Sequence, residues 1–171
     1  MTYLRFMTSD AFSVGRDNSL HHDIDTGYSL ILFYSTQCPH CQSAIDIFKH
    51  LHKTVAGCEF GMINIDDNKG IISTMKKSVL PLEYVPLLVF FANGKAYMMY
   101  SGPLKDANIR QFIEQVAASY NEENNNSRSG TQHTLIDEFE GCAMDDTQCK
   151  DDYVKRQRGC YVTMKEAYAN K

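Results

Sequence analysis

An α/β fold is predicted for roughly the first 120 residues, followed by a C-terminal extension. Three features of the sequence predict it. Short runs of β-branched and aromatic residues are typical of buried strands, and segments with apolar residues at helical spacing alternate with these runs along the chain. After residue 120 the apolar residues stop for a dozen positions. A chain of 171 residues is long enough for one domain with its own core and a tail.

Residues 3–7 are expected to form a short edge strand. Residues 28–34 should form a strand that is buried on both faces, because β-branched and aromatic side chains follow one another there almost without interruption. A helix should follow at Pro39, since proline is tolerated in the first helical turn, where its missing N–H would have no partner. Gly57 ends this helix. Its apolar residues recur at helical spacing: Ile45, Phe48, Leu51 and Val55.

Residues 59–66 alternate apolar and polar side chains, which predicts a second strand. Asp67 and Asn68 come next and are residue types that favour the N-cap of a helix. The inward-facing residues of that helix are expected to be Ile71, Ile72, Met75 and Val79.

A third apolar strand is expected over residues 87–91, directly after Val85 and Pro86. Asn93 and Gly94 predict a two-residue hairpin turn, because both residue types tolerate a positive φ. Residues 95–100 should therefore pair back antiparallel to the third strand. The last helix should bury Ile109, Phe112, Ile113 and Val116.

Three residues outside these patterns receive structural interpretations. His21 and His22 are expected to lie in a solvated loop. Cys58, at the start of a strand, is expected to be a buried thiol that acts as a small hydrophobic residue.

Composition excludes several classes of protein. The chain is 43% hydrophobic and 22% charged with a net charge of −4, so neither a nucleic-acid coat nor a disordered acidic chain is expected. The longest apolar stretches, residues 30–34 and 86–92, are far shorter than the roughly 18 residues of a membrane helix. The first residues lack a cationic segment followed by an apolar run, so no secretory signal is expected. We therefore expect no nucleic-acid partner and no membrane partner.

The chain is expected to divide into a domain over 1–120, a flexible linker over 121–133 and a cysteine-containing tail over 134–171. Residues 121–132 contain no apolar side chain and cannot bury surface. The tail has few apolar residues and should need a disulfide, a metal or the main domain to be ordered.

The six cysteines are the strongest functional signal. Only Cys38 and Cys41 are close in sequence, within the motif Cys-Pro-His-Cys. In a chain without a secretory signal, such a pair more often indicates redox chemistry or metal binding than a structural disulfide.

The cysteines of the tail allow several interpretations. Cys142 and Cys149 are candidates for a local structural disulfide, for free thiols or for a second redox pair. Together with Cys160 and His133 they lack the tight spacing of zinc sites. No metal and no cofactor are therefore expected.

The order of these elements, with the Cys-x-x-Cys motif at a helix start, resembles the thioredoxin superfamily. Further landmarks of the resemblance are Asn64-Ile65-Asp66 at a strand end, Val85-Pro86 before a strand, Asn93-Gly94-Lys95 in a hairpin and Gly102 before the last helix. The resemblance implies a thioredoxin fold, in which a mixed central sheet is flanked by helices in three layers, and a thiol–disulfide oxidoreductase that acts on protein substrates together with a redox partner protein.

The resemblance also implies roles for individual residues. Cys38, at the helix N-terminus, is the partly exposed nucleophile, and Cys41 is more buried and resolves the mixed disulfide. Val85 and Pro86 bind the substrate, with Pro86 as the cis-proline of the family. Pro39 and His40 form the pair found in DsbA-like oxidants, where the imidazole favours the thiolate and makes the disulfide more oxidising.

Four positions depart from the family pattern. Leu32 replaces the buried aspartate beneath the disulfide, and Met62 lies near the position of its accompanying lysine. Tyr34 and Gln37 replace the flanking tryptophans. These departures leave open an alternative function, a redox-inert thioredoxin-like module that binds partner strands in a groove near Pro86.

The end of the tail resembles thioredoxin-like proteins of large DNA viruses. The resemblance rests on Gly159-Cys160-Tyr161 and Glu166-Ala167-Tyr168. It implies a protein that is cytoplasmic or virion-associated.

Overall fold

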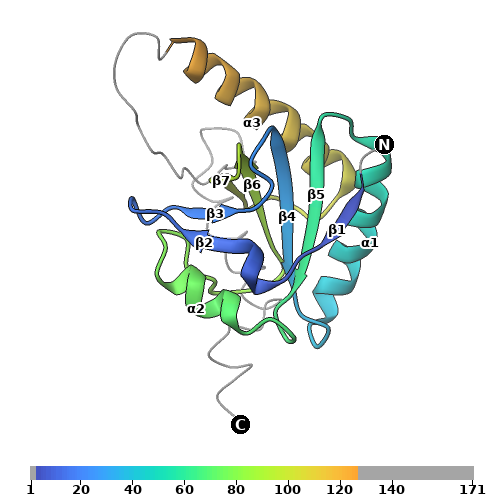
Figure 1. Ribbon diagram of the computed structural model, residues 1–171. Coiled ribbons are helices and arrows are strands. Elements are labelled where there is room, and N and C mark those ends of the chain that lie inside the picture. The colour runs from blue at the N-terminus through green and yellow to red at the C-terminus, as the bar shows by residue number, and fades with distance from the viewer. Residues whose placement is uncertain (1–2, 127–171) are drawn as a thin grey trace, which may run out of the picture.

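A seven-stranded mixed sheet forms the centre of the computed structural model, which describes residues 3–126 (Figure 1). The elements in chain order are β1 (Leu4–Phe6), the 3-10 helix η1 (Ser9–Ala11), β2 (Phe12–Val14), β3 (Leu20–His22), β4 (Tyr28–Tyr34), α1 (Pro39–Thr54), β5 (Cys58–Asn64), α2 (Gly70–Lys76), β6 (Leu87–Ala92), β7 (Lys95–Tyr100) and α3 (Asp106–Asn126). The strand order across the sheet is β1-β5-β4-β6-β7-β3-β2. Strands β1, β5 and β4 are parallel. From β4 outward, each of β6, β7, β3 and β2 runs antiparallel to the strand before it in the sheet.

The two faces of the sheet are covered by different helices, as the alternation of side chains along β4 shows. Leu30 and Leu32 pack with Phe48 of α1 and Phe112 of α3. Ile31 and Phe33 point to the other face, where the buried cluster includes Ile71 and Met75 of α2. Figure 1 shows α1 and α2 on opposite sides of the sheet. The predicted three-layer arrangement of helices around a mixed sheet is therefore confirmed.

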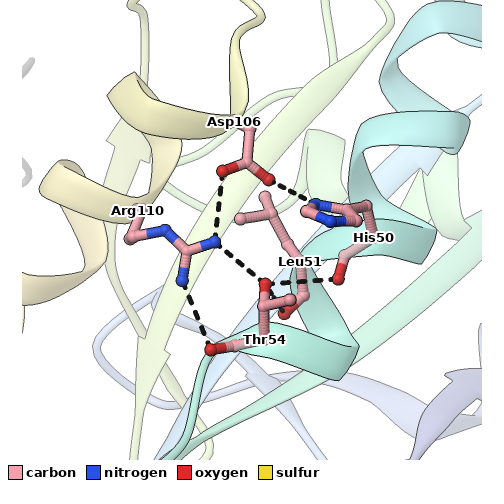
Figure 2. A network of polar contacts seen from close by, with 5 residues as sticks. All are labelled: His50, Leu51, Thr54, Asp106 and Arg110. Carbon is pink, nitrogen blue, oxygen red and sulfur yellow. Dashed lines mark hydrogen bonds and ion pairs between the residues drawn. The ribbon is translucent and has the colours of Figure 1, made fainter.

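Polar contacts join the C-terminal end of α1 to the first turn of α3 (Figure 2). Asp106 accepts hydrogen bonds from His50 Nδ1 at 2.7 Å and from Arg110 at 3.1 Å. Arg110 also donates to the hydroxyl of Thr54 at 2.9 Å. His50 first, and then Arg110, hold the pKa of Asp106 below its ordinary value. These contacts tie together the two helices that cover the Leu30 and Leu32 face of β4.

The expectation that His21 and His22 lie in a solvated loop is wrong. Both belong to β3, which pairs with β7 through His21 and Lys95 and extends the sheet. The His22 side chain is 6% exposed and packs against the ring of Phe91 at 4.3 Å. Its Nε2 lies 2.8 Å from Ser29 Oγ, and its Nδ1 accepts a hydrogen bond from the Ile24 N–H. The histidine can be buried because both ring nitrogens have partners.

Helix α2 is shorter than the apolar spacing predicted. It ends at Lys76, and Val79, expected to face inward, is 50% exposed. Ser78 N–H donates to the Met75 carbonyl, and Val79 N–H donates to the Asn18 carbonyl instead of continuing the helix. The chain therefore leaves the helix before Val79, whose backbone is held by the β2–β3 turn.

Helix α3 continues six residues beyond the expected boundary at residue 120. Tyr28 donates a hydrogen bond to the Asn121 side chain at 2.5 Å, and Tyr97 donates to Glu123 at 2.8 Å. Helix α3 therefore includes the first six residues of the expected linker. The rest of the expected linker and the tail, with Cys142, Cys149 and Cys160, lie outside the described residues. Within residues 3–126, no helix has the length and apolar character needed to cross a bilayer.

Candidate functional site

Cys38 and Cys41 lie together at the N-terminus of α1, directly after the central strand β4. Cys38 is the N-cap residue, with an extended backbone (φ −96°, ψ 114°), and Pro39 occupies the first helical turn. The Cys41 N–H donates to the Cys38 carbonyl at 3.1 Å, which places the two side chains one turn apart on the same side of the helix.

Both cysteines are buried, which corrects the expectation that Cys38 is partly exposed. Cys38 is 3% exposed and Cys41 is fully buried. The Cys38 thiol donates a hydrogen bond to the carbonyl of Val85, with 3.7 Å between Sγ and the oxygen. The segment before β6 therefore helps to cover the Cys38 thiol.

The fold brings Val85 and Pro86 to the cysteines although 47 residues separate Val85 from Cys38. The peptide bond between Val85 and Pro86 is cis, and Val85 is buried in the same apolar cluster as both cysteines. Pro39 and His40 are exposed on the first turn of α1. Cys38 is thus flanked on one side by the Val85 backbone and on the other by the exposed pair of the motif.

Burial is the main cause of the raised pKa of the Cys41 thiol, which lies well above its ordinary value. The Ser35 N–H donates to Cys41 Sγ at 3.5 Å and opposes this shift, because it stabilises the thiolate. The neighbouring thiol of Cys38 and the negative charge of Asp66 raise the pKa further. Cys41 is therefore held as a thiol in the resting site.

Leu32 and Met62, which depart from the family pattern, are buried in the apolar cluster on the α1 and α3 face of the sheet, whereas both cysteines belong to the cluster on the other face. Leu32 and Met62 are register partners on neighbouring parallel strands, and both are buried. The carboxylate that does interact with Cys41 belongs to Asp66, which follows β5. Sequence reasoning used Asp66 only as a landmark of the fold, because its contacts with the loop after β4 join segments about 30 residues apart.

The two positions that replace the flanking tryptophans differ in burial. Tyr34, at the end of β4, is half-buried, and burial followed by the charges of Asp67 and Asp66 raises its pKa. Gln37 is exposed next to Cys38. Neither provides the large aromatic surface that a tryptophan would place beside the motif.

Cys58 lies apart from this site, on β5. It is buried, as expected, and burial raises the pKa of its thiol to about 12.

Within residues 3–126, no three histidine, cysteine or acidic side chains are grouped so that they could hold a metal ion.

Two curated proteins of invertebrate iridescent viruses are similar to this chain. Uncharacterized protein 196R of invertebrate iridescent virus 6 is 32% identical over 98 residues, which cover 57% of this chain and 56% of that protein. Uncharacterized protein 020R of invertebrate iridescent virus 3 is 32% identical over 101 residues, which cover 56% of this chain and 59% of that protein. The chain thus spans just over half the length of these relatives. They confirm the expected resemblance to proteins of large DNA viruses.

Solved structures share the fold at low sequence identity. Human ERp44, in a form I crystal structure, matches with a TM-score of 0.50 and 17% identity, over 67% of this chain and 29% of that chain. The zinc-bound form of human ERp44 matches with a TM-score of 0.51 and 17% identity, over 66% of this chain and 31% of that chain. The sequence profile described as Thioredoxin matches residues 13–115, which include the motif, the Val85–Pro86 segment and most of the sheet. The chain belongs to the thioredoxin family.

Proposed function

We propose that this protein is a thiol–disulfide oxidoreductase that exchanges disulfides with protein substrates through Cys38 and Cys41. The observation that carries the proposal is the geometry of the pair. The two thiols lie one turn apart at the N-terminus of a 16-residue helix, next to the backbone of Val85. Free N–H groups and the helix dipole at this end favour a negative charge on the first sulfur.

The proposed reaction has two steps. Cys38 Sγ, as the thiolate, attacks one sulfur of a substrate disulfide, forms a mixed disulfide and releases the other substrate sulfur as a thiolate. Cys41 then attacks Cys38 Sγ and releases the second substrate sulfur. The substrate gains two electrons and the cysteine pair loses them, while the two thiol protons pass to solvent. The reverse sequence oxidises a substrate dithiol.

The substrate should approach along the segment before β6. The Val85 carbonyl accepts a hydrogen bond from the Cys38 thiol at rest, so ionisation of Cys38 frees this oxygen to accept one from a substrate backbone N–H. Pro86 has no N–H of its own, which leaves Val85 as the backbone group that faces the sulfur. This arrangement supports recognition of an extended peptide next to the disulfide.

The exposed Pro39–His40 pair supports an oxidising role. An imidazole next to Cys38 stabilises the thiolate when it carries a proton, and so stabilises the reduced protein relative to the disulfide. A reduced form that is stabilised in this way makes the disulfide form a stronger oxidant.

The second candidate function is a redox-inert module that binds partner strands. The near-complete burial of Cys38 favours it, because a substrate disulfide cannot easily reach a covered sulfur. The apolar pair of Leu32 and Met62 also favours it, because it lacks the charged groups that the family has at these positions.

An exchange assay separates the two functions. Reduction of insulin disulfides and oxidation of a dithiol peptide would be measured for the wild type, Cys38→Ser, Cys41→Ser and the control Cys58→Ser. An oxidoreductase loses turnover in both site variants, accumulates a trapped mixed disulfide in Cys41→Ser and keeps its activity in Cys58→Ser. If the wild type exchanges no faster than Cys38→Ser in either direction, the redox proposal fails.

A further inference from the structure

The carboxylate of Asp66 holds the loop that joins β4 to α1. It accepts hydrogen bonds from three donors in that loop: the Ser35 hydroxyl at 2.9 Å, the Thr36 N–H at 2.8 Å and the Thr36 hydroxyl at 2.8 Å. Asp66 is itself fixed, because its N–H donates to the side chain of Asn64 at 3.1 Å. A rigid strand end is therefore tied to the loop that precedes the cysteine motif.

The same loop touches the buried cysteine. The Ser35 N–H donates to Cys41 Sγ at 3.5 Å, and the Ser35 hydroxyl accepts a hydrogen bond from the Gln37 N–H at 3.1 Å. Ser35 thus contacts Asp66 through its side chain and Cys41 through its backbone. Cys41 is fully buried, so a thiolate there must be stabilised by protein donors such as this N–H.

From this geometry we infer that Asp66 is a positioning residue for the resolving step, because it clamps Ser35 and Thr36 and so keeps the Ser35 N–H against Cys41 Sγ. The inference rests on the proposed function. In the resolving step Cys41 Sγ bonds to Cys38 Sγ, the bond from Cys38 to the substrate sulfur breaks, and that sulfur leaves as a thiolate. The proton of Cys41 passes to solvent, and the N–H held by the clamp stabilises the sulfur as it loses that proton.

Asp66 also acts on Cys41 in the opposite direction. Its negative charge disfavours the thiolate, as does the neighbouring thiol of Cys38. Tyr34 is a third ionisable group that interacts with Cys41. Two substitutions separate the effect of the hydrogen bonds that Asp66 makes with the loop from the effect of its negative charge. Asp66→Asn removes the charge but keeps an oxygen that can accept from Thr36, whereas Asp66→Ala removes both.

The test follows the two steps of exchange separately. The test uses the full-length chain with Cys142, Cys149 and Cys160 replaced by serine. These replacements are present in the reference protein and in each variant. The reduced protein reacts with an aromatic disulfide reagent whose thiolate product is coloured. The first equivalent of colour reports attack by Cys38, and the second reports resolution by Cys41. Cys58 is buried with a raised pKa and should react more slowly than both.

We expect the second phase of Asp66→Ala to be about tenfold slower than that of the wild type, the effect of one lost hydrogen bond to the attacking sulfur. Its pH profile should move to higher pH. The second phase of Asp66→Asn should be as fast as the wild type or faster, with a profile moved to lower pH. The first phase should change little in both variants. Asp67→Asn is the matched control, since its carboxylate accepts from Asn64 and not from the loop.

Three results for the rate of the second phase would overturn the inference. The first is an equal increase in Asp66→Ala and Asp66→Asn, which would leave only the effect of the charge. The second is no change in either variant, and the third is an equal decrease in both, with no rescue by asparagine. Circular dichroism shows whether Asp66→Ala is folded. If Asp66→Ala is unfolded, the rate and pH profile of Asp66→Asn still test the inference. Failure of the proposed function looks different. In that case the wild type itself shows no second phase and releases no more colour than Cys41→Ser.

Discussion

The carbonyl oxygen of Val85 lies 3.7 Å from Cys38 Sγ and accepts a hydrogen bond from its thiol. This contact joins the segment before β6 to the start of α1. Cys38 is 3% exposed, so little of its sulfur is open to solvent. The backbone that we propose for substrate recognition therefore lies against the sulfur that we propose as the nucleophile.

Shortening the Val85 side chain should expose Cys38. Val85 and Cys38 belong to one buried apolar cluster, so Val85→Ala opens a path to Sγ while the backbone carbonyl stays in place. We expect the rate of Cys38 alkylation by iodoacetamide to rise severalfold, measured by peptide mass analysis. Cys58 in the same sample is the internal control and should keep its rate. An unchanged rate at Cys38 would show that the Val85 side chain does not gate access.

Replacing His40 with proline should make the disulfide of Cys38 and Cys41 harder to reduce. His40 is exposed on the first turn of α1, and a protonated imidazole there stabilises the thiolate of the reduced protein. We expect the reduction potential to become more negative by tens of millivolts, where about 30 mV corresponds to about 1.4 kcal/mol. Equilibration with glutathione measures it. A potential that stays the same or becomes less negative would reject the tuning role.

The positions of the cysteine motif and of the hairpin could be predicted from the sequence, because each depends on residues that are adjacent in the chain. The motif sits at the helix start that Pro39 predicts, and the hairpin at Asn93 and Gly94 forms with positive φ at both residues, 50° and 75°. His22 and Asp66 were not predictable in this way. Each is a polar residue whose role depends on partners brought together by the fold, Ser29 and the loop after β4. Hydrophobic periodicity contains no information about such partners.

The burial of His22 should make stability depend on pH. Burial lowers its pKa to about 4, whereas an unfolded histidine titrates near 6.5. Between these values the unfolded state binds the extra proton, so stability is lost as the pH falls from 6.5 towards 4. The loss between pH 7 and pH 5 should be about 2 kcal/mol. Urea unfolding at both values measures it.

The variant His22→Leu should remove this pH dependence. It is less stable at pH 7, since Ser29 and the Ile24 N–H lose their partner, but its stability should change little between pH 7 and pH 5. His21→Gln, a change at the neighbouring residue of β3, is the matched control and should keep the wild-type slope. If His22→Leu retains the full slope, another group is responsible for it.

The boundary of the folded domain should lie after Asn126 and not at residue 120. Asn121 and Glu123 on the last turns of α3 accept hydrogen bonds from Tyr28 and Tyr97, and a chain that ends at residue 120 lacks both acceptors. Each such bond contributes about 0.5–1.5 kcal/mol, so the 1–120 fragment should be about 1–3 kcal/mol less stable than the 1–126 fragment. Urea unfolding of the two fragments measures the difference. Both should still form a mixed disulfide through Cys38, because the motif and Val85 lie far from the cut. Equal stabilities would show that the last turns of α3 contribute nothing to the domain, whereas loss of exchange in the 1–126 fragment would place residues after 126 in the mechanism.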